Sequence, residues 1–147
     1  IVAIEPHPEN FAQLLHQREQ NHLHRRLRLI RSAVTAHQES ETTLFLGRDH
    51  TGHSCVFPTQ QQIVVPNAPF AVLRELVQGP SLLKVDIQGE EKNLFLPQFR
   101  DVLRAFTVVI AESHADGGED TTGLLEQFLQ TEGIPFERND YVFWIYP

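Results

Sequence analysis

The sequence predicts an α/β fold built on a mostly parallel, doubly wound sheet that ends in an antiparallel hairpin. Three apolar runs, at residues 1–4, 81–87 and 106–111, each suit a strand buried on both faces of a parallel sheet. The first two lead into segments with helical spacing of apolar residues, which is the pattern of repeated βα units. With 147 residues, the chain fits one domain, which we assign to residues 1–147.

The first half of the chain predicts a strand, a loop and a helix, followed by further strands. Phe11, Leu14 and Leu15 fall at i, i+3 and i+4, so an amphipathic helix is expected from Pro8 to about Asn21. Three more strands are expected in the first half, at residues 27–34, 42–46 and 63–65.

The second half predicts three helices and a terminal hairpin. Pro69 opens a helix that Gly79 and Pro80 stop, and the strand 81–87 turns sharply into a helix that contains Leu94 and Phe95. After the strand 106–111, residues 116–118 suggest an exposed loop and a helix is expected over 122–132. Residues 136–146 predict an antiparallel hairpin, because the turn at 139–140 is too short to hold a crossover helix.

The charge and the apolar runs narrow the class of partner. The chain has 12 Lys and Arg against 19 Asp and Glu, a formal charge of −7 that would repel nucleic acid and anionic membranes. No apolar run reaches the roughly 18 residues that span a bilayer, and the start has no signal-peptide pattern. A single cysteine, Cys55, is compatible with a reducing compartment. These features predict a soluble, cytoplasmic protein with a small-molecule partner, and no nucleic-acid or membrane partner.

The candidate functional residues are the polar residues at the ends of the expected strands, because ligands of open parallel sheets bind beyond the carboxyl ends. These residues are Glu5, Ser32 to Val34, Asp86 and Glu112. Glu5 could accept hydrogen bonds from both hydroxyls of a ribose, with Pro6 stiffening the turn. A carboxylate that only stabilises the following helix is an equal alternative for Glu5.

Two further groups of residues have competing interpretations. Lys84 and Asp86 share one side of their strand, so both charges must be paired or lie at its open end. Glu90 and Glu91 begin a helix, where capping and dipole roles are expected. His50, His53 and Cys55 have a spacing known for zinc ligands, but no second cluster completes the set. We therefore expect a solvated loop there and no metal site.

Four segments, in order, resemble the successive signatures of FkbM-family methyltransferases, and the resemblance covers nearly the whole chain. These segments are Ile-Val-Ala-Ile-Glu-Pro-His-Pro-Glu-Asn-Phe at 1–11, Ser-Ala-Val at 32–34, Leu-Leu-Lys-Val-Asp-Ile-Gln-Gly-Glu-Glu at 82–91 and Val-Val-Ile-Ala-Glu-Ser-His at 108–114. The resemblance implies a Rossmann-like methyltransferase fold, S-adenosylmethionine as methyl donor, and methyl transfer to a hydroxyl of a sugar or secondary metabolite.

The resemblance also implies roles for individual residues. Glu5 would hold the ribose of the donor, with Pro6 and Ser32 beside it, and Ala33 and Val34 would flank the adenine. Asp86 would face the methionine part of the donor or the acceptor. Together with Glu112 and His114, Asp86 would line the acceptor side, where His114 or Asp86 could remove the acceptor's proton.

The chain departs from the family pattern at two points. Gln88 stands where the Asp-x-Glu-Gly signature has Glu, and no glycine-rich first strand precedes Ile1. The start inside an apolar run suggests that residues stood upstream, and a catalytically inactive remnant that binds or oligomerises is the alternative function. Without that first strand, we expect either direct pairing of Ile1–Ile4 with Leu83–Ile87 or a homodimer that closes the exposed edge.

Overall fold

The computed structural model describes residues 1–47, 52–56, 58–114 and 121–147 of the chain. Its elements, in chain order, are β1 (Val2–Ile4), α1 (Pro8–Gln20), β2 (Arg28–Ile30), β3 (Ala33–Thr35), β4 (Glu41–Phe45), β5 (Gln62–Pro69), the 3₁₀ helix η1 (Phe70–Leu76), β6 (Leu82–Val85), α2 (Glu91–Leu94), the 3₁₀ helix η2 (Pro97–Phe99), α3 (Arg100–Leu103), β7 (Val108–Glu112), α4 (Thr121–Thr131), β8 (Phe136–Asn139) and β9 (Val142–Ile145). The expected loop at 116–118 lies outside the described residues. Helix α4 and the hairpin β8–β9 confirm the sequence prediction for the end of the chain.

The described strands form three sheets, of which one is parallel and two are mixed. β1 and β2 pair in parallel, β5 lies between β3 and β4, and the largest sheet has the order β6-β7-β9-β8. The pairs β3–β5 and β6–β7 are parallel, whereas β4–β5, β7–β9 and β8–β9 are antiparallel. The α/β class is therefore confirmed, but the expectation of one mostly parallel, doubly wound sheet is not.

The expected direct pairing of Ile1–Ile4 with Leu83–Ile87 is wrong. β1 pairs with β2 through Val2↔Arg28 and Ile4↔Ile30, and β6 pairs with β7 in a different sheet. Among the described strands, none hydrogen-bonds to both β1 and β6 to join the two sheets. The alternative, closure by a second copy of the chain, stays a prediction.

The expected strand over residues 27–34 is two strands with different partners. β2 ends at Ile30, and after Arg31 and Ser32 the chain resumes as β3, which pairs with β5. The hydroxyl of Ser32 donates to the carbonyl of Pro66 in β5 at 3.1 Å, which fixes the change of partner. Residues 27–34 therefore contribute one strand to the β1–β2 sheet and one strand to the β3-β5-β4 sheet.

Two of the expected helices are shorter and tighter than their patterns suggest. The segment after Pro69 is the 3₁₀ helix η1, in which Phe70 and Leu73 are buried and lie three residues apart. A 3₁₀ helix has three residues per turn, so this spacing places both side chains on one side. The helix expected around Leu94 and Phe95 is split into α2, η2 and α3.

The main hydrophobic core lies between the β6-β7-β9-β8 sheet and the helical segments η1, α2, α3 and α4. Its fully buried side chains include Val109 and Phe143 from the sheet and Leu125 and Leu129 from α4. A smaller cluster of Ala33, Leu44 and Val65 holds the β3–β5–β4 sheet together.

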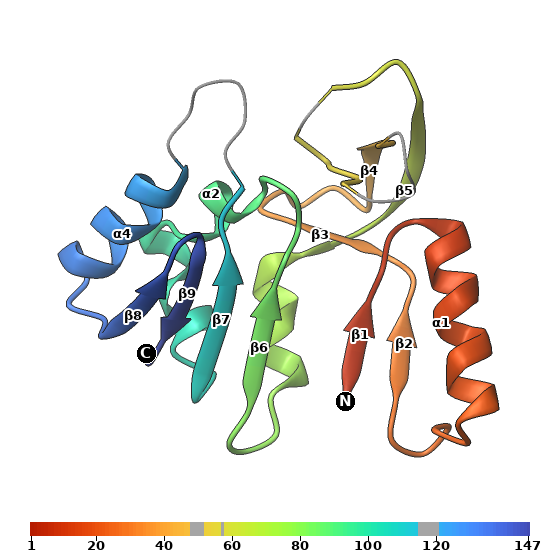
Figure 1. The fold of residues 1–147 in the computed structure, drawn as a ribbon, viewed down its shortest axis with the longest axis horizontal. Helices are drawn as coiled ribbons and strands as arrows, with labels where there is room; N and C mark the ends of the chain where they lie inside the picture. Colours follow the sequence, from red (N-terminus) through yellow and green to blue (C-terminus); the bar gives the residue numbers. More distant parts are fainter. Residues whose placement is uncertain (48–51, 57, 115–120) are drawn as a thin grey trace.

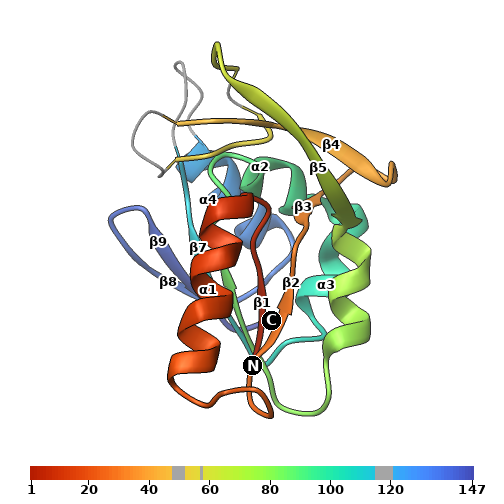
Figure 2. The same ribbon diagram turned by 90° about the vertical axis from the view of Figure 1, so that its right-hand side faces the viewer.

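The arrangement brings the carboxyl ends of the parallel strands to one end of the molecule. In Figure 1, the arrows of β1, β2, β6 and β7 point the same way, toward the end where β3, β4 and β5 lie. Figure 2 shows α1 and η1 on opposite sides of these strands. Among the described residues, no helix is both long and apolar enough to cross a membrane.

The core predicts different costs for truncating two neighbouring leucines of α4. Leu125 is 0% exposed and Leu124 is 49% exposed. Leu125→Ala should lower the free energy of unfolding by about 2–5 kcal/mol, because it removes buried methyl groups and leaves a cavity. Leu124→Ala should change it by less than about 1 kcal/mol, since a surface truncation leaves no cavity. Urea unfolding followed by circular dichroism measures both, and equal losses would show that α4 does not pack as described.

Candidate active site

A cavity of about 210 Å³ lies at the carboxyl ends of β1, β2 and β6. It gathers the six residues that the sequence predicted for donor binding, namely Glu5, Pro6, Ser32, Ala33, Val34 and Asp86. Its described lining also includes residues that sequence reasoning did not assign to a site, namely Ile4, Asn10, Leu44, Gly52, His53, Cys55, Ile87, Gln88 and Glu90. Ligands of α/β proteins bind at this end of the strands, so the cavity is the candidate site.

Glu5 combines a helix-end contact with a free oxygen. Its Oε1 accepts a hydrogen bond from the backbone N–H of His7, the N-cap of α1, at 2.8 Å. Among the described residues, the second oxygen, Oε2, has no hydrogen-bond partner, and Glu5 is partly exposed at the cavity. One oxygen therefore stabilises the start of α1, while the other can accept from a ligand hydroxyl.

Ser32 and Ala33 shape the cavity without offering it a polar group. The hydroxyl of Ser32 is buried and donates to the carbonyls of Ala33, at 2.8 Å, and Pro66. Ala33 is 2% exposed and Val34 is partly exposed. These residues form an apolar wall, which suits contact with a flat ring more than a hydrogen bond.

Residues 52–56 close the cavity from the side of β4. The ring of His53 stacks on His7 with centroids 4.1 Å apart, and Ser54 Oγ donates to the carbonyl of Gln88 at 2.5 Å. Burial, and next the charge of Glu90, raises the pKa of Cys55 to about 11. His50, which the sequence grouped with His53 and Cys55 as possible zinc ligands, lies outside the described residues.

A buried carboxylate, Glu91, fixes the turn that follows β6. Glu91 is 0% exposed; its Oε1 accepts the N–H of Ile87 at 2.8 Å and its Oε2 accepts the N–H of Gly89 at 2.7 Å. Gln88 and Gly89 both have positive φ, which turns the chain sharply enough for residue 91 to reach back to residues 87 and 89. The sequence suggested a helix-end role for Glu91, whereas the carboxylate organises the loop itself.

Glu90 is also buried, but it contacts the segment that follows β3. Its Oε1 accepts the N–H of Ala36 at 3.0 Å, and its Oε2 accepts from the side-chain amide of Asn93 at 3.1 Å. Glu90 therefore ties the segment after β3 to the start of α2. A capping role would be a contact within the helix start itself, whereas the hydrogen bond from Ala36 to Glu90 joins residues that are 54 positions apart in the sequence.

His114 links the ends of β6 and β7. Its Nδ1 lies 3.1 Å from Glu91 Oε1, and its Nε2 lies 3.0 Å from the side-chain nitrogen of Gln88. The hydrogen bond to Glu91 is the main cause that raises the pKa of His114 above 6.5; burial opposes it, and the charges of Glu91, Asp86 and Glu112 add to it. The raised pKa favours the protonated imidazole, which can form charge-assisted contacts with these carboxylates.

Asp86 lies within reach of His114 and is held ionised. Burial opposes the charge of Asp86, but Lys84, and next His114, outweigh burial and lower the pKa of Asp86. Lys84 Nζ contacts Asp86 Oδ2 at 2.8 Å, and Gln88 donates to Oδ1 at 3.2 Å. The two charges that the sequence placed on one side of the strand thus pair with each other.

The predicted acceptor-side residues lie together, next to the cavity. His114 Nε2 is 3.6 Å from Asp86 Oδ1 and 3.7 Å from Glu112 Oε1. Of the three residues, Asp86 lines the cavity, while Glu112 and His114 are outside its described lining. Asp86 and Gln88 therefore stand between the cavity and His114.

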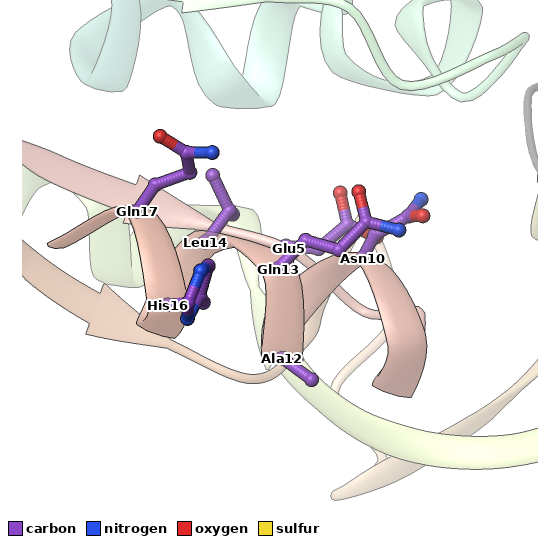
Figure 3. A pocket seen from close by; sticks show the side chains of 7 residues that line it. All are labelled: Glu5, Asn10, Ala12, Gln13, Leu14, His16 and Gln17. Carbon is purple, nitrogen blue, oxygen red and sulfur yellow. The ribbon is translucent and has the colours of Figure 1, made fainter. Parts of the chain in front are cut away.

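A second, larger hollow of about 580 Å³ runs along α1. Figure 3 shows Glu5, Asn10, Gln13, Leu14 and Gln17 pointing to the same side of this helix. Its described lining comes from residues 5–17 alone, so one short segment provides all of it. Glu5 and Asn10 line both spaces, so the hollow adjoins the cavity at the start of α1.

These features define an α/β protein with a cavity, lined by both polar and apolar residues, at the carboxyl ends of its parallel strands. The model of the methyltransferase FkbM domain family matches residues 1–143, and the chain belongs to this family. Searches of curated proteins and of solved structures found no match.

The contact between His114 and Glu91 predicts a pH dependence of stability. Because the folded state raises the pKa of His114, protonated His114 should stabilise the fold fully below pH 6.5, and this contribution should be lost as the pH rises through the higher, folded-state pKa. Glu91→Gln removes the largest cause and should lower the pKa of His114. An NMR titration of the imidazole, in buffer with a chelator, measures this pKa.

Glu90→Gln is the matched control for this titration. It removes a neighbouring buried carboxylate that is not among the causes of the pKa shift of His114. The pKa of His114 should therefore stay raised in Glu90→Gln. Equal pKa values in Glu91→Gln and the unmodified chain would contradict the assignment of Glu91 as the cause.

Proposed function

We propose that the chain is an S-adenosylmethionine-dependent methyltransferase that methylates a hydroxyl oxygen of a sugar or secondary metabolite. Membership of the FkbM methyltransferase domain family supports the type of reaction. The observation that carries the proposal for this chain is the cavity itself: six residues expected to contact the donor, drawn from three separate segments, line one space.

The nucleoside part of the donor is the part that fits this cavity. Small-molecule sites commonly have about 300–1,000 Å³, and the cavity has about 210 Å³. In the proposed complex, Glu5 Oε2 accepts from a ribose hydroxyl, and Ala33 and Val34 contact the adenine. The adjoining hollow along α1 gives space for a further part of the donor.

The proposed reaction needs an acceptor oxygen, a methyl group and a site for one proton. The acceptor oxygen forms a bond to the methyl carbon as the bond between that carbon and the sulfonium sulfur breaks, which leaves S-adenosylhomocysteine and a methyl ether. The acceptor's proton moves to His114 Nε2. His114 is the stronger base of the two, because the pKa of its imidazole is raised, whereas the pKa of Asp86 is lowered.

Gln88 sets a condition on this proton transfer. Its side-chain nitrogen lies 3.0 Å from His114 Nε2, so the amide donates to the nitrogen that must accept the proton. The acceptor hydroxyl has to displace that contact, which a rotation of the Gln88 side chain achieves. In the proposed mechanism, positioning of the acceptor in line with the sulfur and methyl contributes most of the rate enhancement.

Glu5→Ala should weaken binding of S-adenosylmethionine by about 1–3 kcal/mol, the scale of a charge-assisted hydrogen bond. That loss corresponds to about a 5- to 150-fold rise in Kd. Calorimetric titration of the purified chain with S-adenosylmethionine measures it.

Glu9→Ala is the matched control for Glu5→Ala. Glu9 is an exposed carboxylate in the first turn of the same helix, and it is outside the described lining of the cavity. Donor affinity should be unchanged in this variant. Equal weakening in both variants would show a general charge effect, and no binding by the unmodified chain would contradict the proposed function.

Asp86→Asn should reduce methyl transfer much more than it reduces stability. The change keeps the shape of the side chain but removes the charge that faces the cavity and pairs with the exposed Lys84. An exposed ion pair contributes only about 0–1 kcal/mol to stability. Transfer of labelled methyl groups from S-adenosylmethionine to candidate hydroxyl acceptors, compared with urea unfolding, separates the two effects. A large loss of stability with full activity would make Asp86 a structural residue.

A further inference from the structure

Three side chains with metal-ligand atoms meet at the carboxyl ends of β6 and β7. Asp86, Glu112 and His114 each offer one such atom, and the three atoms lie within 4.8 Å of one another. Two of the separations are shorter, 3.6 Å from His114 Nε2 to Asp86 Oδ1 and 3.7 Å to Glu112 Oε1. Bonds of about 2.0–2.2 Å to one ion place ligand atoms about 3–4 Å apart, so small movements complete the set.

The backbone fixes this meeting. In the parallel pairing of β6 and β7, Val85 is opposite Ala111, so Asp86 and Glu112 leave the sheet side by side. His114 follows two residues after Glu112, and the buried hydroxyl of Ser113, held by the carbonyl of Tyr141 at 3.1 Å, anchors the chain between them. Glu112 ends β7, and Asp86 and His114 lie one and two residues beyond the ends of β6 and β7, so the register of the sheet brings the three residues together.

The imidazole of His114 is oriented in the way that metal-binding histidines usually are. Metal-ligating histidines commonly donate their second ring N–H to a carboxylate, which fixes the tautomer and directs the other nitrogen to the ion. Here the Nδ1 of His114 contacts the fully buried Glu91, and its Nε2 faces Asp86 and Glu112. This second observation separates the cluster from a simple group of acidic residues.

The charges at the cluster suit a divalent cation. Asp86, Glu112 and Glu91 are three carboxylates; among the described residues, the ammonium group that contacts them is that of Lys84, which lies against Asp86 Oδ2 and leaves Oδ1 toward His114. With His114 neutral, as a metal ligand must be, three negative charges and one positive charge leave two negative charges among these groups. The side-chain nitrogen of Gln88 lies 3.0 Å from His114 Nε2 and 3.2 Å from Asp86 Oδ1, so a donor already sits between two of the lone pairs that would bind a cation.

We propose that Asp86, Glu112 and His114 form a binding site for a divalent transition-metal cation. Two carboxylates and one imidazole favour ions such as Mn²⁺ over Mg²⁺ and Ca²⁺, which prefer oxygen ligands alone. On binding, the Gln88 side chain turns so that its carbonyl oxygen, in place of its N–H group, faces the cation.

The site also gives the cation a role, which rests on the proposed function. Asp86 and Gln88 border the cavity, so the coordination positions that the three ligands leave free are expected on the side of the cavity. An acceptor hydroxyl bound there would be positioned, and the cation would lower the pKa of its oxygen. With the cation bound, His114 Nε2 would be a ligand and the acceptor's proton would pass to solvent water; without the cation, His114 Nε2 accepts the proton, as in the reaction proposed above.

Titration of the purified chain with MnCl₂, followed by electron paramagnetic resonance of free Mn²⁺, tests the binding site without any methyl donor. We expect one saturable site per chain. Glu112→Gln should weaken it at least about 10-fold, because the change removes a charged ligand, and Glu91→Gln should weaken it about 10- to 100-fold through the orientation of His114. Gln88→Glu should tighten it, because a carboxylate replaces the competing amide. Because Gln88→Glu should raise the Mn²⁺ affinity, its result cannot be explained by a variant that fails to fold.

Glu137→Gln is the matched control, because Glu137 is an exposed carboxylate on β8, at the far edge of the same sheet. Its Mn²⁺ affinity should match that of the unmodified chain. No saturable Mn²⁺ binding, or binding that Glu112→Gln and Gln88→Glu leave unchanged, would overturn the proposal and identify the cluster as an imidazolium held by carboxylates. Binding of S-adenosylmethionine is measured separately, in the presence of a chelator. Donor binding without Mn²⁺ binding would overturn the cation site alone, and Mn²⁺ binding without donor binding would overturn the proposed function alone.

Discussion

The site depends on one buried carboxylate, that of Glu91. A carboxylate removed from water is costly unless hydrogen bonds replace the water, and Glu91 finds them at two backbone N–H groups and one imidazole. These contacts fix the conformation of the turn after β6 and the orientation of the His114 imidazole after β7. Asp86 and Gln88 lie within the segment that this turn directs, and His114 lies at the other end of the same network. One side chain thus places groups that the sequence separates by 28 residues, from 86 to 114.

The positions of the candidate residues could be predicted from the sequence because they follow from topology. A polar residue that ends a buried apolar run lies at the carboxyl edge of the sheet, whatever the detailed packing is. The sequence therefore indicated Glu5, Asp86 and Glu112, and the structure brings Glu5 and Asp86 to one cavity. The role of Glu91 could not be found in this way. Its burial depends on positive φ at Gln88 and Gly89, which turns a helix-start carboxylate inward. The Gln-Gly pair signals a turn but not its direction.

The class and the terminal hairpin were also predictable, whereas the division into three sheets was not. The apolar spacing of α4 and the short turn of the β8–β9 hairpin involve residues close together in the sequence, so both elements can be predicted from the sequence alone. The choice of partner strand is not local: β3 leaves the course of β2 because its residues pair with β5, more than 30 positions later. The hydrogen bond from the buried hydroxyl of Ser32 to the carbonyl of Pro66 joins the two segments, but neither residue type indicates this pairing in the sequence. Long-range pairing therefore overrides what an apolar run suggests.

The distribution of charge around the cavity bears on how the proposed reaction could proceed. S-adenosylmethionine carries a positive sulfonium, and methyl transfer removes that charge, so a carboxylate close to the sulfur would stabilise the starting state more than the transition state. In the proposed complex Glu5 avoids this effect, because its contact with an uncharged ribose would contribute the same binding energy before and during the reaction. In the proposed complex Asp86 is the carboxylate nearer the acceptor, and its contact with Lys84 at 2.8 Å offsets part of its charge. A cation at Asp86, Glu112 and His114 would offset the rest and stabilise the negative charge that develops on the acceptor oxygen. The acidic cluster is thus compatible with methyl transfer when its charge is directed at the acceptor and away from the sulfur.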